Sequence, residues 1–549
     1  MKLSLPILLL FICLQFKAQI TPSIAWTYSL NSAVFGSAAS ADIDKDGKSE
    51  IVFAAYNNDG RVHCLNAEDG SLKWTYNISG CGDVAISIYD LDGDDTLDVF
   101  VNGSCNPSAF CINGLTGALT WSVPSGGGDS PPTIADIDND GKPEIVFGNF
   151  SGQIRILNGE DGSLNKNIQV ISSTIQTDPV LVDVNNDGNL DIIVANHFNN
   201  TGYYTYCYDY VTSTTHWVNF HADNVSTYYA YHGGALADID KDGKMEYVIG
   251  ANNGLVRALN VENGSVLWSI SNPSASVMGA ISIADVNNDD TLDVIYHRGD
   301  ANNSIVVANG FTGQVKWSYP VMAGAFRGSA VSDLNGNGKL DLVSAHYMGK
   351  IHAVEPFSGL LWTLDLWPLF PQTLPYLMTD NGPLVDDFDG DGFLDVFVAA
   401  GYSTYSVNPN SIGRAYMIKG NTGTCPPWTM YRHDHNRSGY ISANEINTQC
   451  SIINGVKEKE LIGMNVKVSP QPFIDKTEIS VSGLNTKKAT LSIRDLQGRL
   501  VAVKTAEQLQ QKGSDFFWEW NSEKVEQGIY LYQIEDGSIQ LNGKLFKNK

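Results

Sequence analysis

One short acidic phrase recurs eight times along this chain of 549 residues. The phrase reads Asp-x-Asp/Asn-x-Asp/Asn-x-x-x-Asp/Glu, and each copy runs directly into an apolar, β-prone segment, as in DIDKDGKSEIVFAA from Asp42. Successive copies start 46 to 55 residues apart. A period near 50 residues is typical of solenoids, arrays and propellers. The repeat therefore overrides the three or four domains that length alone would suggest.

The phrase has the spacing of a calcium loop. Hard cations bind six to eight oxygen atoms, and alternate residues of a tight turn can direct their side-chain oxygens to one point. No helical period flanks the phrases, which excludes EF-hands. The predicted calcium ligands are Asp42, Asp44, Asp46, Glu50; Asp90, Asp92, Asp94, Asp98; Asp136, Asp138, Asp140, Glu144; Asp183, Asn185, Asp187, Asp191; Asp238, Asp240, Asp242, Glu246; Asp285, Asn287, Asp289, Asp293; Asp333, Asn335, Asn337, Asp341; and Asp387, Asp389, Asp391, Asp395.

The loops differ in charge. The loop that starts at Asp333 supplies two carboxylates, whereas the loop that starts at Asp387 supplies four. Because a site with fewer charged ligands binds calcium more weakly, we expect the seventh site to fill last. The acidic phrases also account for much of the formal net charge of −25, which argues against a nucleic-acid partner.

Each repeat predicts one four-stranded antiparallel blade. A small-residue strand enters the acidic loop, an Ile/Val-rich strand leaves it, and two further strands follow, the last with Gly-x-x-x-Trp as in GSLKWTY. Eight such units predict an all-β, eight-bladed propeller, with seven blades plus a degenerate unit as the alternative. Residues 24–30 resemble an outer strand without a blade of their own, so we expect them to complete the last blade. A rival strand around Trp428 follows two prolines, which cannot donate to the interior of a ladder.

The N-terminus predicts export. Residues 1–18 combine Lys2, a short apolar run and Ala18, as in a secretory signal peptide. No later stretch approaches the ~20 apolar residues of a membrane-spanning helix. Disulfides are expected in an oxidising compartment. Cys81 and Cys105 flank the second acidic loop symmetrically, and Cys425 with Cys450 could close a second, short loop.

The repeat units resemble the FG-GAP/VCBS repeats of integrin α-like propellers over residues 22–441. The resemblance rests on eight copies of the calcium phrase, each followed by an aliphatic strand. It implies a calcium-stiffened extracellular propeller that serves as a binding platform or an enzyme scaffold. The Gly-x-x-x-Trp segments also resemble the outer strands of quinoprotein propellers, but the chain has no adjacent pair of cysteines, so no bound quinone is predicted.

A polar linker at 442–464 precedes a different domain at 465–549. Its landmarks are Pro470-Gln-Pro472-Phe473, Leu496-Gln-Gly498-Arg499, Gly528-Ile-Tyr530 and a basic end. In this order they resemble the type A C-terminal sorting domain of the type IX secretion system, although Gln471 stands where that family usually has Asn. The resemblance implies an immunoglobulin-like β-sandwich, a partner in the type IX machinery, and release or attachment at the cell surface. The alternative is an ordinary immunoglobulin-like accessory module.

Two groups of residues are candidates for a ligand site. If the acidic loops share one face, the turns that enter the first strands lie on the opposite face, where they place His232 and Arg327 around the channel. Two long intervals carry aromatic insertions, which tend to lie on binding faces of repeat proteins, and one holds Trp367 and Tyr376.

These residues favour a binding module over an enzyme. Acidic, aromatic and imidazole groups suit a sugar or a peptide, and metalloprotease, nucleophile-elbow and phosphate-loop motifs are missing from the sequence. We expect a secreted or cell-surface propeller that binds an extracellular glycan or protein. The alternative is a polysaccharide lyase or related glycan-degrading enzyme, because rhamnogalacturonan lyases include propellers that resemble this one.

Overall fold

The computed structural model describes residues 20–170, 174–197, 203–222, 229–299, 303–322, 324–423, 425–428, 430–434 and 438 of the first unit. Of the second unit it describes 465–469, 473, 475–482, 489–495, 500–505, 510–512, 515–522, 525, 528–536 and 539–547. The units divide at Ile452/Ile453. The predicted signal peptide and linker lie outside the described residues, as does the side-chain pairing of Cys425 with Cys450. Within the described residues, no helix is long and apolar enough to cross a membrane.

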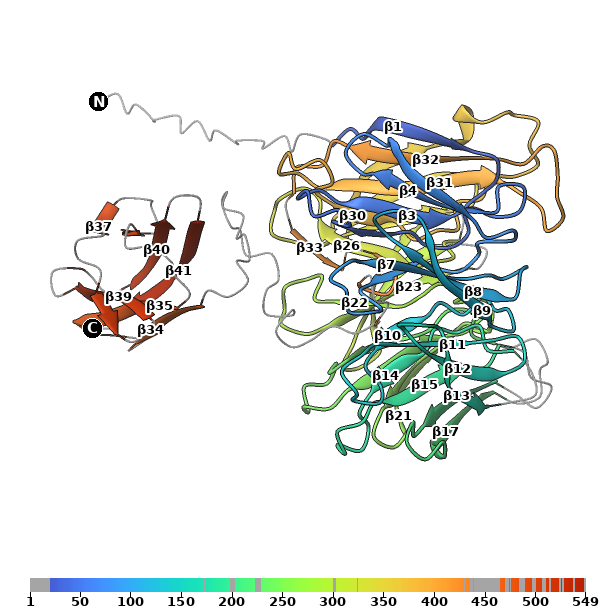
Figure 1. Ribbon diagram of the computed structural model, residues 1–549, viewed down its shortest axis with the longest axis horizontal. Helices are drawn as coiled ribbons and strands as arrows, with labels where there is room; N and C mark the ends of the chain where they lie inside the picture. The colour runs from blue at the N-terminus through green and yellow to red at the C-terminus, as the bar shows by residue number, and fades with distance from the viewer. Residues whose placement is uncertain are drawn as a thin grey trace, which may run out of the picture. The chain divides into compact units, whose positions relative to one another are not determined.

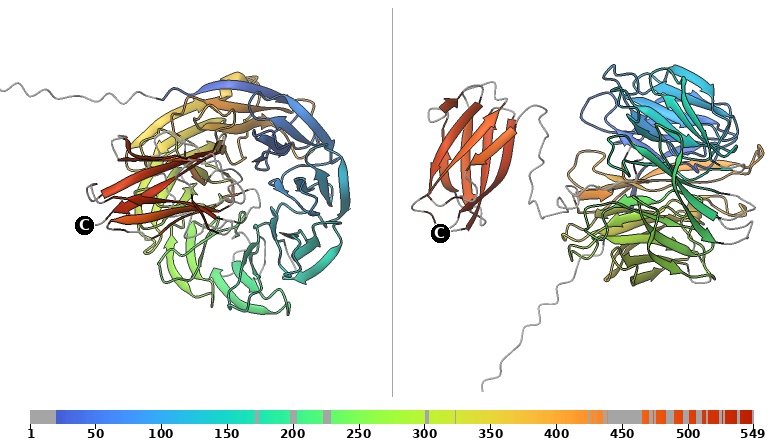
Figure 2. Two further views of the ribbon diagram at one scale, coloured as in Figure 1. Left: turned by 60° about the vertical axis from the view of Figure 1, so that its left-hand side comes forward. Right: turned by 90° about the horizontal axis from the view of Figure 1, so that it is seen from below.

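The described part of the first unit forms eight antiparallel sheets, one for each acidic phrase, arranged in a ring (Figure 2, left). We call these sheets blades and number them in the order of their phrases. Blades 1 to 3 contain β2 (Ala39–Ala41), β3 (Glu50–Ala54), β4 (Arg61–Asn66), β5 (Leu72–Asn77); β6 (Ser87–Tyr89), β7 (Asp98–Asn102), β8 (Ser108–Asn113), β9 (Leu119–Pro124); β10 (Thr133–Ala135), β11 (Glu144–Gly148), β12 (Gln153–Asn158) and β13 (Leu164–Gln169).

Blades 4 to 6 contain β14 (Val180–Val182), β15 (Asp191–Ala195), β16 (Tyr203–Tyr208), β17 (Thr215–Ala222); β18 (Ala235–Ala237), β19 (Glu246–Gly250), β20 (Leu255–Asn260), β21 (Val266–Ser271); β22 (Ser282–Ala284), β23 (Asp293–Arg298), β24 (Ser304–Asn309) and β25 (Val315–Pro320). Blade 7 contains β26 (Ser329–Asp333), β27 (Asp341–His346), β28 (Lys350–Glu355), β29 (Gly359–Asp365) and a fifth strand, β33 (Cys425–Trp428). Between blades 7 and 8, residues Trp367–Leu369 form the 3-10 helix η1.

The last blade is completed by the start of the chain. Blade 8 has the order β1-β32-β31-β30, in which β1 (Ser23–Leu30) pairs antiparallel with β32 (Ile412–Lys419) (Figure 1). Its other strands are β30 (Leu384–Asp386) and β31 (Asp395–Tyr402). The N-terminal strand is therefore the outer strand of blade 8, as the sequence predicts. The rival segment around Trp428 pairs instead with the inner strand of blade 7.

Neighbouring blades interlock through the Gly-x-x-x-Trp segment. The indole N–H of Trp74 in blade 1 donates to the carbonyl of Gly114 in blade 2, at 2.6 Å. Gly117 of blade 2 lies against the same indole ring with φ +70°, and a Cβ there would come within 2.7 Å of the ring. Only glycine combines this φ with so close an approach. The same indole contact to the next blade recurs for Trp26 with Ala67, Trp121 with Gly159, Trp217 with Val261 and Trp268 with Gly310.

The second unit is a β-sandwich. One sheet has the order β34 (Asn465–Ser469), β35 (Lys476–Ser482), β39 (Asp515–Asn521), β38 (Gln510–Lys512), and the other has β37 (Leu500–Lys504), β36 (Thr490–Asp495), β40 (Gly528–Asp536), β41 (Ile539–Lys547). Side chains from both sheets, such as Trp518 and Leu491, share one buried core. Two antiparallel sheets over a common core agree with the predicted immunoglobulin-like fold.

Candidate metal loops and channel mouth

All eight acidic loops share one backbone arrangement. In the first, one carboxylate oxygen of Asp42 accepts from the N–H of Gly47 at 2.9 Å, and Glu50 accepts from the N–H of Ile43 at 2.9 Å. Lys45 and Gly47 take positive φ values of 60° and 90°, which turn the chain tightly around the carboxylates. The first Asp of every loop accepts from the N–H five residues later. This turn brings the predicted ligands together.

The carboxylates of these loops meet closely enough to share a cation. Ligand oxygens of Asp42, Asp44 and Glu50 lie within 4.8 Å of one another. The same holds for the sets Asp90, Asp92, Asp94; Asp136, Asp138, Glu144; and Asp238, Asp240, Glu246. A hard divalent cation is the ligand that such an oxygen cluster accepts.

Blade 5 shows most directly that the residues fit an ion. Glu246 is fully buried, and its Oε2 accepts from the N–H of Ile239 at 3.0 Å. Its Oε1, and Oδ1 of Asp238, are buried without a hydrogen-bond partner among the described residues. Burial and the nearby loop carboxylates raise the pKa of Glu246 to about 8. Buried carboxylate oxygens without donors call for a bound cation.

The seventh loop has a carboxylate that the repeat pattern does not include. Glu355, at the end of β28, is 2% exposed and accepts from the side-chain amides of Asn335 at 3.1 Å and Asn337 at 2.7 Å. Burial, Asp333 and Glu355 together raise the pKa of Asp341 to about 8. The expectation that this site fills last counted two carboxylates, and the structure adds a third. Sequence reasoning missed it because Glu355 lies outside the phrase, where five of the sibling blades have Asn.

The face opposite the acidic loops holds the channel mouth, which we define by the residues that enter the first strands. The structure brings together three of these in one cluster: Asp83, Arg327 and Asp380. Arg327 is 3% exposed and donates through Nη2 to the carbonyl of Asp83 at 2.8 Å. Its Nε and Nη1 have no hydrogen-bond partner among the described residues. Burial raises the pKa of Asp83 to about 7 and that of Asp380 to about 6, although Arg327 opposes both shifts.

A segment of the chain itself lies in the channel. Residues 425–428 and 430–434, which we call the channel segment, begin beside Asp333, where Cys425 pairs with it, and reach the mouth at Tyr431. The hydroxyl of Tyr431 donates to Asp178 at 2.7 Å and lies 3.1 Å from Nδ1 of His232. The Arg327 guanidinium lies 5.4 Å from the centre of the Tyr431 ring. The two predicted ligand residues, His232 and Arg327, thus contact the channel segment.

Arg432 anchors this segment to blades 4 and 5. It is 2% exposed, and its guanidinium donates to the carbonyls of Gly234 at 2.9 Å and Pro179 at 3.0 Å. Its first part pairs with blade 7 as β33, but the segment carries neither an acidic phrase nor Gly-x-x-x-Trp, so the repeat pattern did not predict its place in the channel.

Two hollows lie near the predicted ligand residues. One, of about 560 Å³, is on the channel-mouth face between blades 6 and 8. Its lining includes His297, Phe326, Tyr347 and Asp380. The other, of about 620 Å³, lies between β1, the insertion after η1 and residues 409–414.

Tyr376 and Trp367, the two candidate ligand residues of the insertion, have different surroundings. The centre of the Tyr376 ring lies 6.0 Å from that of Tyr347, which lines the first hollow, and the Tyr376 hydroxyl donates to the carbonyl of Ser403 at 3.1 Å. Trp367 is half-buried and packs against the core of blades 7 and 8. Neither Tyr376 nor Trp367 lines either of these two hollows.

The structure joins Cys81 to Cys105 in a disulfide, with a Cα–Cα distance of 5.0 Å. Both cysteines lie at the end of blade 2 away from its acidic loop, because Cys81 precedes β6 and Cys105 follows β7. The bond therefore fastens the channel-mouth side of this blade.

The comparisons with known proteins agree with both units. Residues 42–101, 90–147, 136–194, 183–249 and 238–296 match the FG-GAP-like repeat, and residues 467–548 match the secretion system C-terminal sorting domain. Among curated proteins, the comparison finds no match.

Solved structures with a similar fold are quinohemoprotein alcohol dehydrogenases. That of Pseudomonas putida is 13% identical, with 73% of this chain and 77% of that one covered and a TM-score of 0.51. That of Comamonas testosteroni is 12% identical, with 72% and 76% covered and a TM-score of 0.50. At this identity the likeness shows the propeller fold alone.

Proposed function

We propose that this protein is a secreted or cell-surface calcium-binding propeller that recognises an extracellular ligand. The chain carries FG-GAP-like repeats and a secretion system C-terminal sorting domain, which support this proposal. The sorting domain points to a location outside the cell, handled by the type IX machinery. The loops act as hinges between the first and second strands of each blade, so calcium bound there stiffens the ring. Calcium sites of extracellular proteins bind the ion with a Kd of roughly 10⁻⁴ to 10⁻³ M.

The hollow on the channel-mouth face carries the binding proposal. At about 560 Å³ it falls in the size range of ligand pockets, and it combines the rings of Phe326 and Tyr347 with the polar groups of His297 and Asp380. Aromatic faces beside hydrogen-bonding groups suit a carbohydrate, which presents apolar C–H faces and hydroxyls together. A carbohydrate is therefore the first ligand class to test, and a protein ligand is the second.

A glycan array probed with the full chain in calcium tests this proposal. We expect Tyr347→Ala to weaken binding about fivefold or more, since an aromatic contact in a pocket contributes roughly 1 to 3 kcal/mol. Tyr405→Ala is the matched control, because Tyr405 is 84% exposed and does not line the hollow. Equal loss of binding in both variants, or no effect in either, would contradict the placement of the site.

The glycan-degrading alternative gains no support from the geometry. A lyase acting on an anionic polysaccharide needs a base and a charge-neutralising group, and Arg327, one candidate for this role, is buried against the channel segment and does not line the hollow. An assay for unsaturated products from pectic substrates distinguishes the two functions. Product formation that Arg327→Ala abolishes, in a variant that still folds, would favour the lyase.

A further inference from the structure

Each blade carries a β-bulge at one fixed position of its outer strand. In blade 1, Cys64 pairs with Trp74 and Leu65 with Leu72, which leaves Lys73 as the extra residue. In each of the other blades, the pairing between the third strand and the outer strand shifts by one residue at the same position. The bulge residues are Ala25, Lys73, Thr120, Asn165, His216, Leu267, Lys316 and Leu361. Bulges re-aim side chains, and in blades 1, 3, 4 and 6 the bulge residue contacts a carboxylate of the acidic loop in its own blade.

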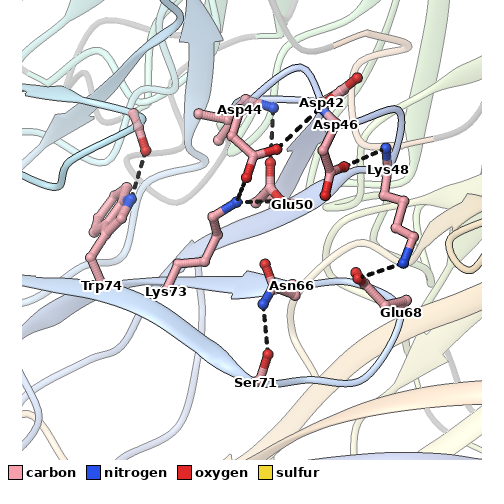
Figure 3. Close-up of polar contacts among 12 residues, drawn as sticks. Asp42, Asp44, Asp46, Lys48, Glu50, Asn66, Glu68, Ser71, Lys73 and Trp74 are labelled. Carbon is pink, nitrogen blue, oxygen red and sulfur yellow. Dashed lines mark hydrogen bonds and ion pairs between the residues drawn. The ribbon is translucent and has the colours of Figure 1, made fainter.

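The contacts of the bulge residues show where they point. The Lys73 ammonium bonds to Asp44 and, at 2.9 Å, to Oε1 of Glu50, so it lies among the ligand carboxylates themselves (Figure 3). Lys316 reaches Asp289 at 3.1 Å, and Asn165 donates to Asp138 at 3.0 Å. In blade 8 the bulge residue is Ala25, and Lys419 from the end of β32 contacts Asp389 and Asp391 instead.

Blade 5 is the opposite case. Its bulge residue, Leu267, carries no charge, and its loop retains Asp238, Asp240, Asp242 and Glu246. Buried oxygens of Asp238 and Glu246 there have no partner among the described residues, whereas in blade 1 both oxygens of Glu50 accept hydrogen bonds. The same phrase is thus satisfied by the chain's own ammonium in one blade and left open in another.

We propose that these flanking cations decide which acidic loops hold a divalent ion. The Lys73 ammonium of blade 1 occupies the space and charge that calcium would take. Lys419 in blade 8 and Lys316 in blade 6 are weaker versions, because buried oxygens of Asp395 and Asp293 have no hydrogen-bond partner among the described residues. The loops of blades 2, 3 and 5 lack such a cation and bind the metal. This inference rests on the proposed calcium binding and refines it, because it makes the number of ions smaller than the number of phrases.

Calcium counted per chain, by equilibrium dialysis and elemental analysis of the full protein, tests the inference. We expect Lys73→Met to gain one calcium ion. Lys48→Met is the matched control, because Lys48 belongs to the same loop but its ammonium bonds to Glu68, at 3.0 Å, outside the ligand cluster. It should leave the count unchanged, and Lys73→Met without a gain would overturn the inference.

The reciprocal change keeps the test decisive if Lys73→Met folds poorly. Leu267→Lys places an ammonium at the bulge of blade 5 and should remove one ion, whereas Leu267→Met should remove none. Retention of that ion in Leu267→Lys overturns the inference. Eight ions bound by the unmodified chain overturn the inference alone, and no bound calcium overturns the proposed calcium binding with it.

Discussion

The loop face and the channel-mouth face of the ring are built from the same repeat, but the loop face keeps the same acidic phrase in every blade and the channel-mouth face varies its residues. On the loop face, eight blades repeat one hydrogen-bonded turn, and the first Asp of every phrase accepts the same N–H. On the channel-mouth face, equivalent positions hold different residues, such as Asp83, His232 and Arg327. The face with repeated residues therefore maintains the architecture, and the face with varied residues is the one that can recognise a specific ligand.

Removal of calcium should have the largest effect, because it acts on the repeated face at several sites at once. Ligand linkage over several occupied loops predicts that excess chelator lowers the Tm of the propeller by about 10 °C at millimolar calcium. The measurement is a thermal scan with and without chelator, and magnesium added at equal ionic strength is the control. An unchanged transition would contradict metal binding by the loops.

Tyr431→Ala tests whether the non-repeated channel segment also supports the ring. The side chain is 3% exposed and touches residues from several blades, so its loss should lower the free energy of unfolding by about 3 to 5 kcal/mol. Tyr431→Phe retains the packing and should cost about 1 to 2 kcal/mol through the lost hydrogen bond to Asp178. Denaturant titration measures both values. Equal stability of the Ala variant and the parent would show that the segment merely rests in the channel.

The disulfide on the channel-mouth side of blade 2 should contribute somewhat less. Cys81 and Cys105 are 24 residues apart, and loop closure of this length stabilises the fold by roughly 3 kcal/mol on the chain-entropy estimate. The double Ser variant should show this loss in denaturant. Cys64→Ala, which removes a free buried thiol where blade 5 has Ala258, should cost about 1 kcal/mol. A double variant as stable as the parent would show that the bond contributes little.

The smallest effect concerns pH at the channel mouth. Burial raises the pKa of Asp83 to about 7 and that of Asp380 to about 6, so both carboxyls bind protons more tightly in the folded chain than in the unfolded one. Their contribution to stability is complete below the unfolded pKa near 4 and is lost as pH rises through 6 to 7. In saturating calcium, Tm should fall by about 1 to 3 °C between pH 5 and 8, and Asp83→Asn with Asp380→Asn should flatten the profile. A profile unaffected by both substitutions would assign the pH response to other groups.

The sequence predicts the repeated features of this molecule well and the singular ones poorly. Period, strand pattern and Gly-x-x-x-Trp are sufficient for the propeller, the N-terminal strand in the last blade and the sandwich. The Cys81–Cys105 pairing follows from symmetry about one loop. These features depend on local spacing, which a sequence displays directly.

The missing features depend on contacts between distant residues. Lys73 could not be assigned to the first loop from the sequence, because the β-bulge that turns its side chain toward the loop has no signature in the residue pattern. Glu355 and Tyr431 act at sites defined by other blades. The assignment of His232 and Arg327 to the mouth agrees with the structure, but their burial against the channel segment could not be read from the repeat.

The pairing of β1 with β32 also determines when the ring can close during folding. The two strands are the first and nearly the last elements of the ring, so a chain that emerges from the ribosome in sequence cannot complete blade 8 until β32 has been synthesised. Until then, Trp26 has no β32 beside it, and the seam between blades 8 and 1 stays open. Closure of this ring therefore requires that nearly the whole propeller has been synthesised.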